Sequence, residues 1–223
     1  MVVAAGQPLH ASVGKLIGAR TCTGVLVLNP RIVVTSAHCL VGRDGNLIKK
    51  PVTFVLNYYD DGAPLKLQGR IERVGSTRQY RGYTLRDGAM DWGIVLLDRA
   101  PANVHPLLLR SVSGSDIARL RIALSAFSID VDNGRALAVD DRVSILSLRW
   151  GVYLHDSEWA LGSSGAPLLV HTSEGLAVIA INSACLFAPR PGEGGALTML
   201  HAAVPASSFE GAVREIQDRF ARR

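Results

Sequence analysis

Short apolar runs separated by Gly, Pro, Asn and Asp recur along most of the chain. Residues 24–35 contain two such runs joined at Asn29-Pro30-Arg31, and residues 52–59 and 65–74 flank Asp60-Asp61-Gly62. Apolar runs on both sides of turn-forming residues predict β-hairpins. Further strands are predicted at Trp92–Asp98, Leu120–Phe127, Ala136–Val139, Val143–Arg149, Val152–His155, Ala166–Val170, Leu176–Asn182 and Met199–Val204. Many short strands joined by tight turns favour an all-β sandwich or barrel.

Only the C-terminus has the pattern of a helix. An apolar stripe at roughly helical spacing is formed by Phe209, Val213, Ile216 and Phe220. Ser207 precedes this stripe, and Glu210 follows its first residue. The two form the S-x-x-E pattern of a capping box, which predicts a helix over residues 207–223. The stretch 98–116 is the best candidate for a linker, so we expect one β-unit over residues 1–108 and a second over residues 109–206.

Composition and charge narrow the function. Apolar residues make up 48% of the chain and charged residues 19%, which excludes disorder. The net charge is +5, but the arginines are scattered and not interleaved with aromatic residues, so we expect no nucleic-acid partner. No apolar run approaches the roughly 18 to 20 residues of a membrane span. The sequence therefore predicts a folded protein that neither binds nucleic acid nor spans a membrane.

Cysteine and histidine spacing argues against a metal site. Three cysteines with no C-x-x-C pair predict one disulfide and one free thiol rather than a zinc or redox centre. No metal-ligand spacing is present among His10, His105, His155, His171 and His201. We therefore interpret these five histidines as structural or surface residues and expect no metal.

The segment VVTSAHCL places His38 directly after an apolar strand, at a tight bend. Cys39 follows His38, and Cys22 lies one predicted strand earlier in TCTGVLV. If these two strands pair, a Cys22–Cys39 disulfide would fix the loop that carries His38, a constraint worth about 3 kcal/mol by chain entropy. A histidine held in this way is a better candidate for catalysis than an isolated one.

An acidic partner for His38 is offered by MDWGIVLL, where Asp91 precedes a predicted buried strand. Taken alone, Asp91 fits a solvated turn, but a histidine that needs an orienting acceptor favours a buried carboxylate. Asp87 is the rival, although it lies farther from the strand and next to Gly88. We select Asp91.

The segment LGSSGAPLLV, residues 161–170, places Ser164 between glycines just before an apolar run. A glycine–serine turn is the plain interpretation. A serine hydroxyl acts as a nucleophile only when a base removes its proton and dipoles stabilise the oxyanion. Gly162 and Gly165 allow a sharp turn that could direct the N–H groups of Gly162 and Ser164 to one point. Together with a histidine and an aspartate, this turn favours a reaction centre.

These segments together resemble the chymotrypsin/trypsin-like serine peptidase family, from about Gly14 to the C-terminal helix. The resemblance implies an all-β fold of two six-stranded antiparallel β-barrels with a C-terminal α-helix. It also implies hydrolysis of protein or peptide substrates through an acyl-enzyme, without a cofactor. The implied roles make Ser164 the nucleophile, His38 the general base and then acid, and Asp91 the group that orients His38. The N–H groups of Gly162 and Ser164 would form the oxyanion hole.

One departure from the family is informative. Animal members usually carry an aspartate before the nucleophile, and it pairs with an amine released by zymogen cleavage. Ser163 occupies that position here, so we expect no such switch and a loop held by other contacts. GSSGAP is more similar to the bacterial branch that includes the glutamyl endopeptidases. This likeness implies a bacterial, exported enzyme, secreted or periplasmic, whose signal peptide lies outside this sequence.

The family pattern also suggests which residues bind the substrate side chain before the scissile bond, the P1 residue. Glu158 would line the first pocket, and Asn182, Ser183 and Ala184 would form its wall. A buried Glu158 would favour Arg or Lys, whereas Asn182 stands where glutamyl endopeptidases typically have a histidine. We therefore expect a weak preference for basic P1 residues. Cys185 would be a free, buried thiol near the wall.

Two other functions fit parts of the pattern. GSSGA nearly matches the nucleophile elbow of α/β-hydrolase esterases, in which His201 could be the base, but that fold needs alternating helices and strands. The second alternative is a catalytically inactive binding module of the chymotrypsin-like fold. Only the reactivity of Ser164 separates this second alternative from an enzyme.

Overall fold

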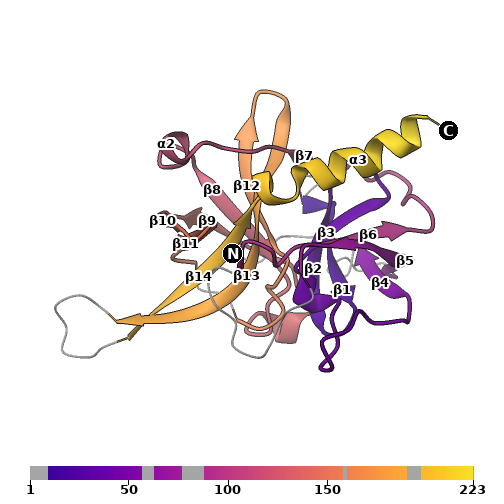
Figure 1. The fold of residues 1–223 in the computed structure, drawn as a ribbon, viewed down its shortest axis with the longest axis horizontal. Coiled ribbons are helices and arrows are strands. Elements are labelled where there is room, and N and C mark those ends of the chain that lie inside the picture. The colour runs from indigo at the N-terminus through magenta and orange to yellow at the C-terminus, as the bar shows by residue number, and fades with distance from the viewer. Residues whose placement is uncertain (1–9, 57–62, 77–87, 158–159, 190–196, 223) are drawn as a thin grey trace.

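Two β-sheet units and a C-terminal helix form the part of the chain that the computed structural model describes, residues 10–56, 63–76, 88–157, 160–189 and 197–222 (Figure 1). The first unit is a closed barrel of antiparallel neighbours in the order β1-β2-β3-β6-β5-β4. Its strands are β1 (Val13–Ile17), β2 (Thr21–Leu26), β3 (Ile32–Thr35), β4 (Val52–Leu56), β5 (Leu65–Val74) and β6 (Gly93–Leu97).

The second unit is a curved eight-stranded sheet in the order β10-β11-β14-β13-β12-β8-β9, with β7 beside β13. Its strands are β7 (Leu108–Leu109), β8 (Ile122–Ala126), β9 (Ala138–Val143), β10 (Ile145–Arg149), β11 (Val152–His155), β12 (Pro167–Thr172), β13 (Gly175–Pro189) and β14 (Leu197–Pro205). Short helical turns occur at α2 (Gly114–Ile117), Ala37–Cys39, Asp132–Gly134 and Ala206–Ser208, and α3 (Glu210–Ala221) ends the fold.

The predicted all-β architecture with a C-terminal helix is confirmed, with one difference in detail. In the described residues the second unit is a half-barrel of eight strands, one of which is the two-residue β7 beside β13. The α/β-hydrolase alternative is wrong, because β12 pairs antiparallel with both of its neighbours and helices do not alternate with the described strands.

Most predicted strands are present, but β1 was not foreseen. Its sequence, VGKLI, is short, and a glycine and a lysine interrupt its apolar residues. It becomes a strand because it pairs with both β2 and β4 and so closes the first barrel. The predicted hairpin of β4 and β5 is confirmed by the pairing of Leu56 with Leu65, and its turn lies outside the described residues.

The three largest groups of buried side chains in the described residues stabilise the fold. One fills the first barrel around Leu16, Phe54 and Val95, and it includes Cys22 and Cys39. A second fills the other sheet. The third joins the two units, because it combines residues of β2 and β3 with residues of β12, β13 and α3. This shared core holds the two units in a fixed relation, and the candidate site lies where they meet.

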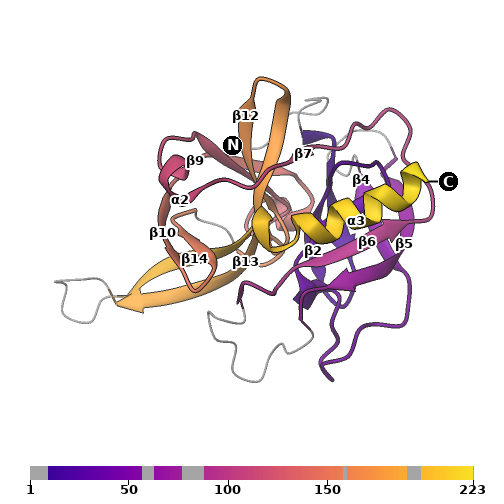
Figure 2. The same ribbon diagram turned by 45° about the horizontal axis from the view of Figure 1, so that its top comes forward.

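Helix α3 begins beside the second unit and runs back across the first (Figure 2). It buries Phe209, Val213 and Ile216 in the shared core, and each such side chain contributes roughly 1.5–3 kcal/mol. The predicted capping box at Ser207 is wrong. Burial of Phe209 places it at the N-cap, Ser207 lies in the preceding helical turn, and Glu210 instead pairs with Arg214. None of the described helices is long and apolar enough to cross a membrane.

Candidate active site

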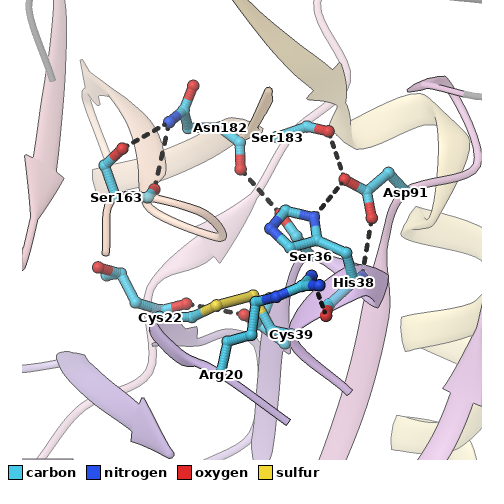
Figure 3. A network of polar contacts seen from close by, with 11 residues as sticks. Arg20, Cys22, Ser36, His38, Cys39, Asp91, Ser163, Asn182 and Ser183 are labelled. Atoms are coloured by element: carbon cyan, nitrogen blue, oxygen red, sulfur yellow. Dashed lines mark hydrogen bonds and ion pairs between the residues drawn. A yellow bond between two sulfur atoms is a disulfide. The ribbon is translucent and has the colours of Figure 1, made fainter. Parts of the chain in front are cut away.

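His38 lies in the helical turn that follows β3. The strands β2 and β3 pair through Val25 and Val34, and this pairing brings Cys22 within reach of Cys39. The predicted disulfide joins these two cysteines, with their Cα atoms 6.2 Å apart. The disulfide therefore constrains the helical turn through Cys39, the residue that follows His38 (Figure 3). Nδ1 or Nε2 of His38 and the two sulfur atoms lie within 4.8 Å of one another, but sulfurs joined in a disulfide cannot act as thiolate metal ligands.

Asp91 lies immediately before Trp92 and β6, the strand that pairs with β3. Its carboxylate is fully buried, with Oδ2 2.8 Å from Nδ1 of His38 and Oδ1 accepting the backbone N–H of His38 at 3.0 Å. The hydroxyl of Ser183 donates to the same Oδ2 (Figure 3). An ionised carboxylate only accepts hydrogen bonds, so Nδ1 of His38 carries a proton and Nε2 is left as the basic nitrogen. The rival Asp87 lies outside the described residues.

Ser164 is half-buried on the tight turn before β12. The shape of this turn requires glycine at two of its positions. Gly162 and Gly165 have φ angles of +100° and +80°, a region that residues with a side chain rarely adopt. A Cβ atom on Gly165 would lie 2.3 Å from the carbonyl oxygen of Thr23 and 3.0 Å from the backbone nitrogen of Ser36. The turn therefore packs directly against the end of β3, two residues before His38.

Along the turn, backbone N–H groups that have a protein acceptor alternate with N–H groups that have none among the described residues. The N–H of Ser163 donates to the carbonyl oxygen of Ala160, and the N–H of Gly165 donates to that of Asn182. Among the described residues, the N–H groups of Gly162 and Ser164 have no protein acceptor. These two N–H groups, separated by one residue on the turn, are the predicted donors to an oxyanion.

A cavity of about 850 Å³ opens beside Ser164. The predicted wall residues Asn182, Ser183 and Ala184 all line it. The prediction of a buried Cys185 is wrong. Its side chain is exposed on the cavity wall, on β13, the strand that projects from the body of the sheet together with β14 (Figure 1). Glu158 lies outside the described residues. The remaining lining residues are Asp130, Leu146, Asp156, Ser157, Ala160, Leu161, Ser163, Cys185, Leu200 and His201.

Two buried histidines, His155 and His201, lie in or behind the cavity wall, with ring centres 5.5 Å apart. Burial, and to a lesser extent the neighbouring ring of His201, lowers the pKa of His155 to about 3. Burial also lowers the pKa of His201, whose Nε2 has no hydrogen-bond partner among the described residues. Both rings are therefore neutral at physiological pH.

Comparison by sequence finds no relative: no family model and no curated protein matches the chain. Comparison of folds finds similar solved structures. The serine protease AL20 from an extremophilic microorganism superposes with a TM-score of 0.63 at 15% identity, covering 92% of this chain and 95% of that one. A Glu endopeptidase gives 0.69 at 16% identity, covering 94% and 93%. The protease Anisep from Arthrobacter nicotinovorans gives 0.62 at 16% identity, covering 91% and 95%.

The chain has the fold of the chymotrypsin-like serine proteases. Within this chymotrypsin-like fold, the structure brings His38 and Asp91 into contact and seats the turn of Ser164 against the segment that carries His38. Asn182 and Ser183 line the cavity, but their polar atoms are also engaged elsewhere, by the turn and by Asp91.

Sequence reasoning missed several residues that hold this site together. Thr23 donates its backbone N–H to the carbonyl oxygen of Ser164 and its hydroxyl to that of Gly162, both at 2.9 Å. The hydroxyl of Ser36 donates to the carbonyl oxygen of Asn182 at 2.9 Å. A buried hydroxyl one or two residues from a cysteine or a histidine is a weak signal in sequence, because its partner lies in the other half of the chain.

Proposed function

We propose that the chain is a serine endopeptidase that hydrolyses peptide bonds through an acyl-enzyme. Ser164 is the nucleophile, His38 the general base and then acid, and Asp91 the residue that orients His38. The observation that carries the proposal is the buried contact between Nδ1 of His38 and Asp91 at 2.8 Å, on the segment against which the Ser164 turn packs. The chymotrypsin-like fold supports the same assignment.

The reaction follows from the protonation of these groups. Nε2 of His38 takes the hydroxyl proton of Ser164 as Oγ attacks the scissile carbonyl carbon. The N–H groups of Gly162 and Ser164 stabilise the oxyanion, and each such donor is worth roughly 10²- to 10³-fold in rate. His38 then donates the proton to the leaving amine, and water hydrolyses the ester with the same base.

Cleavage after basic residues is proposed as a weak preference. Among the described cavity residues, Asp130 and Asp156 carry charge, and both are negative. Both are exposed, so solvent screens them and limits the selectivity that they provide. Profiling with a peptide library tests this preference. Enrichment of Arg and Lys at P1 supports it, whereas cleavage only after Glu contradicts it.

Export from a bacterial cell is proposed from the disulfide and the fold. Structural disulfides form and persist in oxidising compartments, and Cys22–Cys39 fixes the turn that carries His38. One similar structure comes from the bacterium Arthrobacter nicotinovorans. Thiol counting of protein recovered from the source cells, by mass spectrometry without reduction, tests the pairing. A single alkylated cysteine is expected, and three would contradict export into an oxidising compartment.

A fluorophosphonate probe tests the catalytic assignment directly. Such a probe phosphonylates a serine only when its hydroxyl is activated, so one adduct on Ser164 is expected in the wild-type chain. Ser164→Ala should abolish labelling, and His38→Ala should slow it by at least about 10³-fold. Folded wild-type protein that does not label would favour the inactive binding module.

A further inference from the structure

Asn182 connects the turn of Ser164 to the rest of the site through its side chain and its backbone (Figure 3). Its Nδ2 donates to Oγ of Ser163 at 3.0 Å and to the carbonyl oxygen of Ser163 at 3.3 Å. Oγ of Ser163 in turn donates to the carbonyl oxygen of Ala160 at 2.8 Å. Ser163 separates the two residues that would supply the oxyanion hole, so these contacts act at the centre of the turn.

The orientation of the Asn182 amide follows from the imidazole behind it. Oδ1 of Asn182 lies 3.2 Å from Nε2 of His155, and Nδ1 of His155 lies 2.8 Å from the hydroxyl of Ser157. If the amide were reversed, Oδ1 would face two oxygen atoms of Ser163, its carbonyl oxygen and its Oγ. Neither could donate to Oδ1, because the Oγ proton is already donated to Ala160. Nε2 of His155 therefore carries the proton, and Ser157 donates to Nδ1.

All members of this relay are buried: Ser157, His155, Asn182 and Ser163 are each at most 4% exposed. The low pKa of His155 keeps its ring neutral, so Nδ1 stays available to accept from Ser157. A buried polar chain in which each donor has an acceptor fixes one arrangement of its members.

The backbone at Asn182 holds the turn from a second direction. Its carbonyl oxygen accepts the N–H of Gly165 at 2.7 Å and the hydroxyl of Ser36 at 2.9 Å. The register between β13 and β14 shifts between Asn182 and Ala184, as in a β-bulge. A bulge re-aims side chains, and here Asn182 contacts the turn while Ser183 reaches Asp91.

We propose that Asn182, oriented by His155 and Ser157, is the positioning residue that holds the N–H groups of Gly162 and Ser164 in place for the oxyanion. This inference rests on the proposed function. It assigns a neutral hydrogen-bond relay to the task of keeping the turn in its reactive shape. None of its members other than Ser163 borders Ser164 in sequence, and none removes or delivers the reacting proton.

Replacement of Asn182 by Leu tests the relay, because Leu has a similar volume and cannot donate to Ser163. The assay is hydrolysis of p-nitrophenyl acetate, with active sites counted by exhaustive fluorophosphonate labelling. We expect kcat per labelled site to fall about 10- to 100-fold while KM changes less than about 3-fold, since a misplaced oxyanion hole weakens the transition state selectively. The Ki of phenylboronic acid, which forms a tetrahedral adduct, should rise by a similar factor.

Two further variants separate positioning from folding. His155→Leu removes the donor to Asn182 and should lower kcat per site about tenfold, whereas His155→Gln keeps an amide donor and should retain most of the rate. Ser125→Ala is the matched control, because Ser125 and His10 form a buried pair at the same 2.8 Å distance and neither residue lines the cavity beside Ser164. A purely structural role would reduce the number of labelled sites without changing the rate at each one.

The outcomes are distinguishable. A rate per site in Asn182→Leu within about 3-fold of wild type overturns the relay while leaving the protease assignment intact. If Asn182→Leu does not fold, equal rates per site in His155→Leu and Ser125→Ala overturn it. Wild-type protein that neither labels nor hydrolyses the ester overturns the proposed function, and the relay with it.

Discussion

Acidification offers a quantitative test of the buried imidazole of His155. Its pKa is about 3 in the folded chain, against an ordinary value of 6.5. The unfolded chain therefore binds a proton between these values and the folded chain does not, so stability is greatest above pH 6.5 and falls as the pH drops toward 3. From these two values, His155 alone costs about 2 kcal/mol of stability at pH 5.0, rising toward about 5 kcal/mol below pH 3.

Urea denaturation followed by tryptophan fluorescence measures this loss. Ser164→Ala serves as the background for all samples, because an active protease would digest its own unfolded chains. The free energy of unfolding is compared at pH 7.5 and pH 5.0 with and without His155→Gln. His10, whose pKa is also lowered, titrates in both proteins and so cancels in the comparison. His201 lies 5.5 Å from the His155 ring and is coupled to it, so the measured difference belongs to this pair of histidines. On acidification, we expect the free energy of unfolding to fall by about 2 kcal/mol more in the protein that keeps His155 than in the His155→Gln protein.

Equal losses in the two proteins would refute the reasoning. Such a result would mean that His155 binds a proton in the folded chain as readily as in the unfolded one. Its Nδ1 could then not accept from Ser157, and the argument that orients Asn182 would lose its basis.

Three further changes test other parts of the site. Replacing Cys22 and Cys39 together by Ala removes a cross-link over a separation of 17 residues and should cost about 3 kcal/mol in urea denaturation; an unchanged midpoint would contradict this. Gly165→Ala should lower the melting temperature far more than Gly45→Ala, because both glycines have φ of +80° but only at Gly165 would the added Cβ lie 2.3 Å from protein oxygen atoms; equal shifts would argue against close packing of the turn. Ser183→Ala removes a donor to the Asp91 carboxylate and should lower kcat about tenfold, about 1.4 kcal/mol, in ester hydrolysis; an unaltered kcat would show that this donor is dispensable.

Local sequence patterns were sufficient to predict most strands and the candidate catalytic residues. Hairpins such as β2–β3 depend on neighbouring apolar runs and the turn between them, which the sequence displays directly. The capping box failed because burial of Phe209 overrode a local preference of Ser207. The same limit applies to Cys185, whose exposure the apolar residues around it in the sequence do not reveal.

What the sequence by itself determined was the set of chemical groups: a histidine after a strand, an aspartate before one, and a serine between glycines. What only the tertiary structure decided was their support. Asn182 reaches Ser163 across 19 residues and Ser36 across 146, and β1 becomes a strand only when β2 and β4 flank it. Hydrogen bonds between such distant positions leave no periodic trace in the chain, because each depends on where a folded backbone places one buried polar atom beside another.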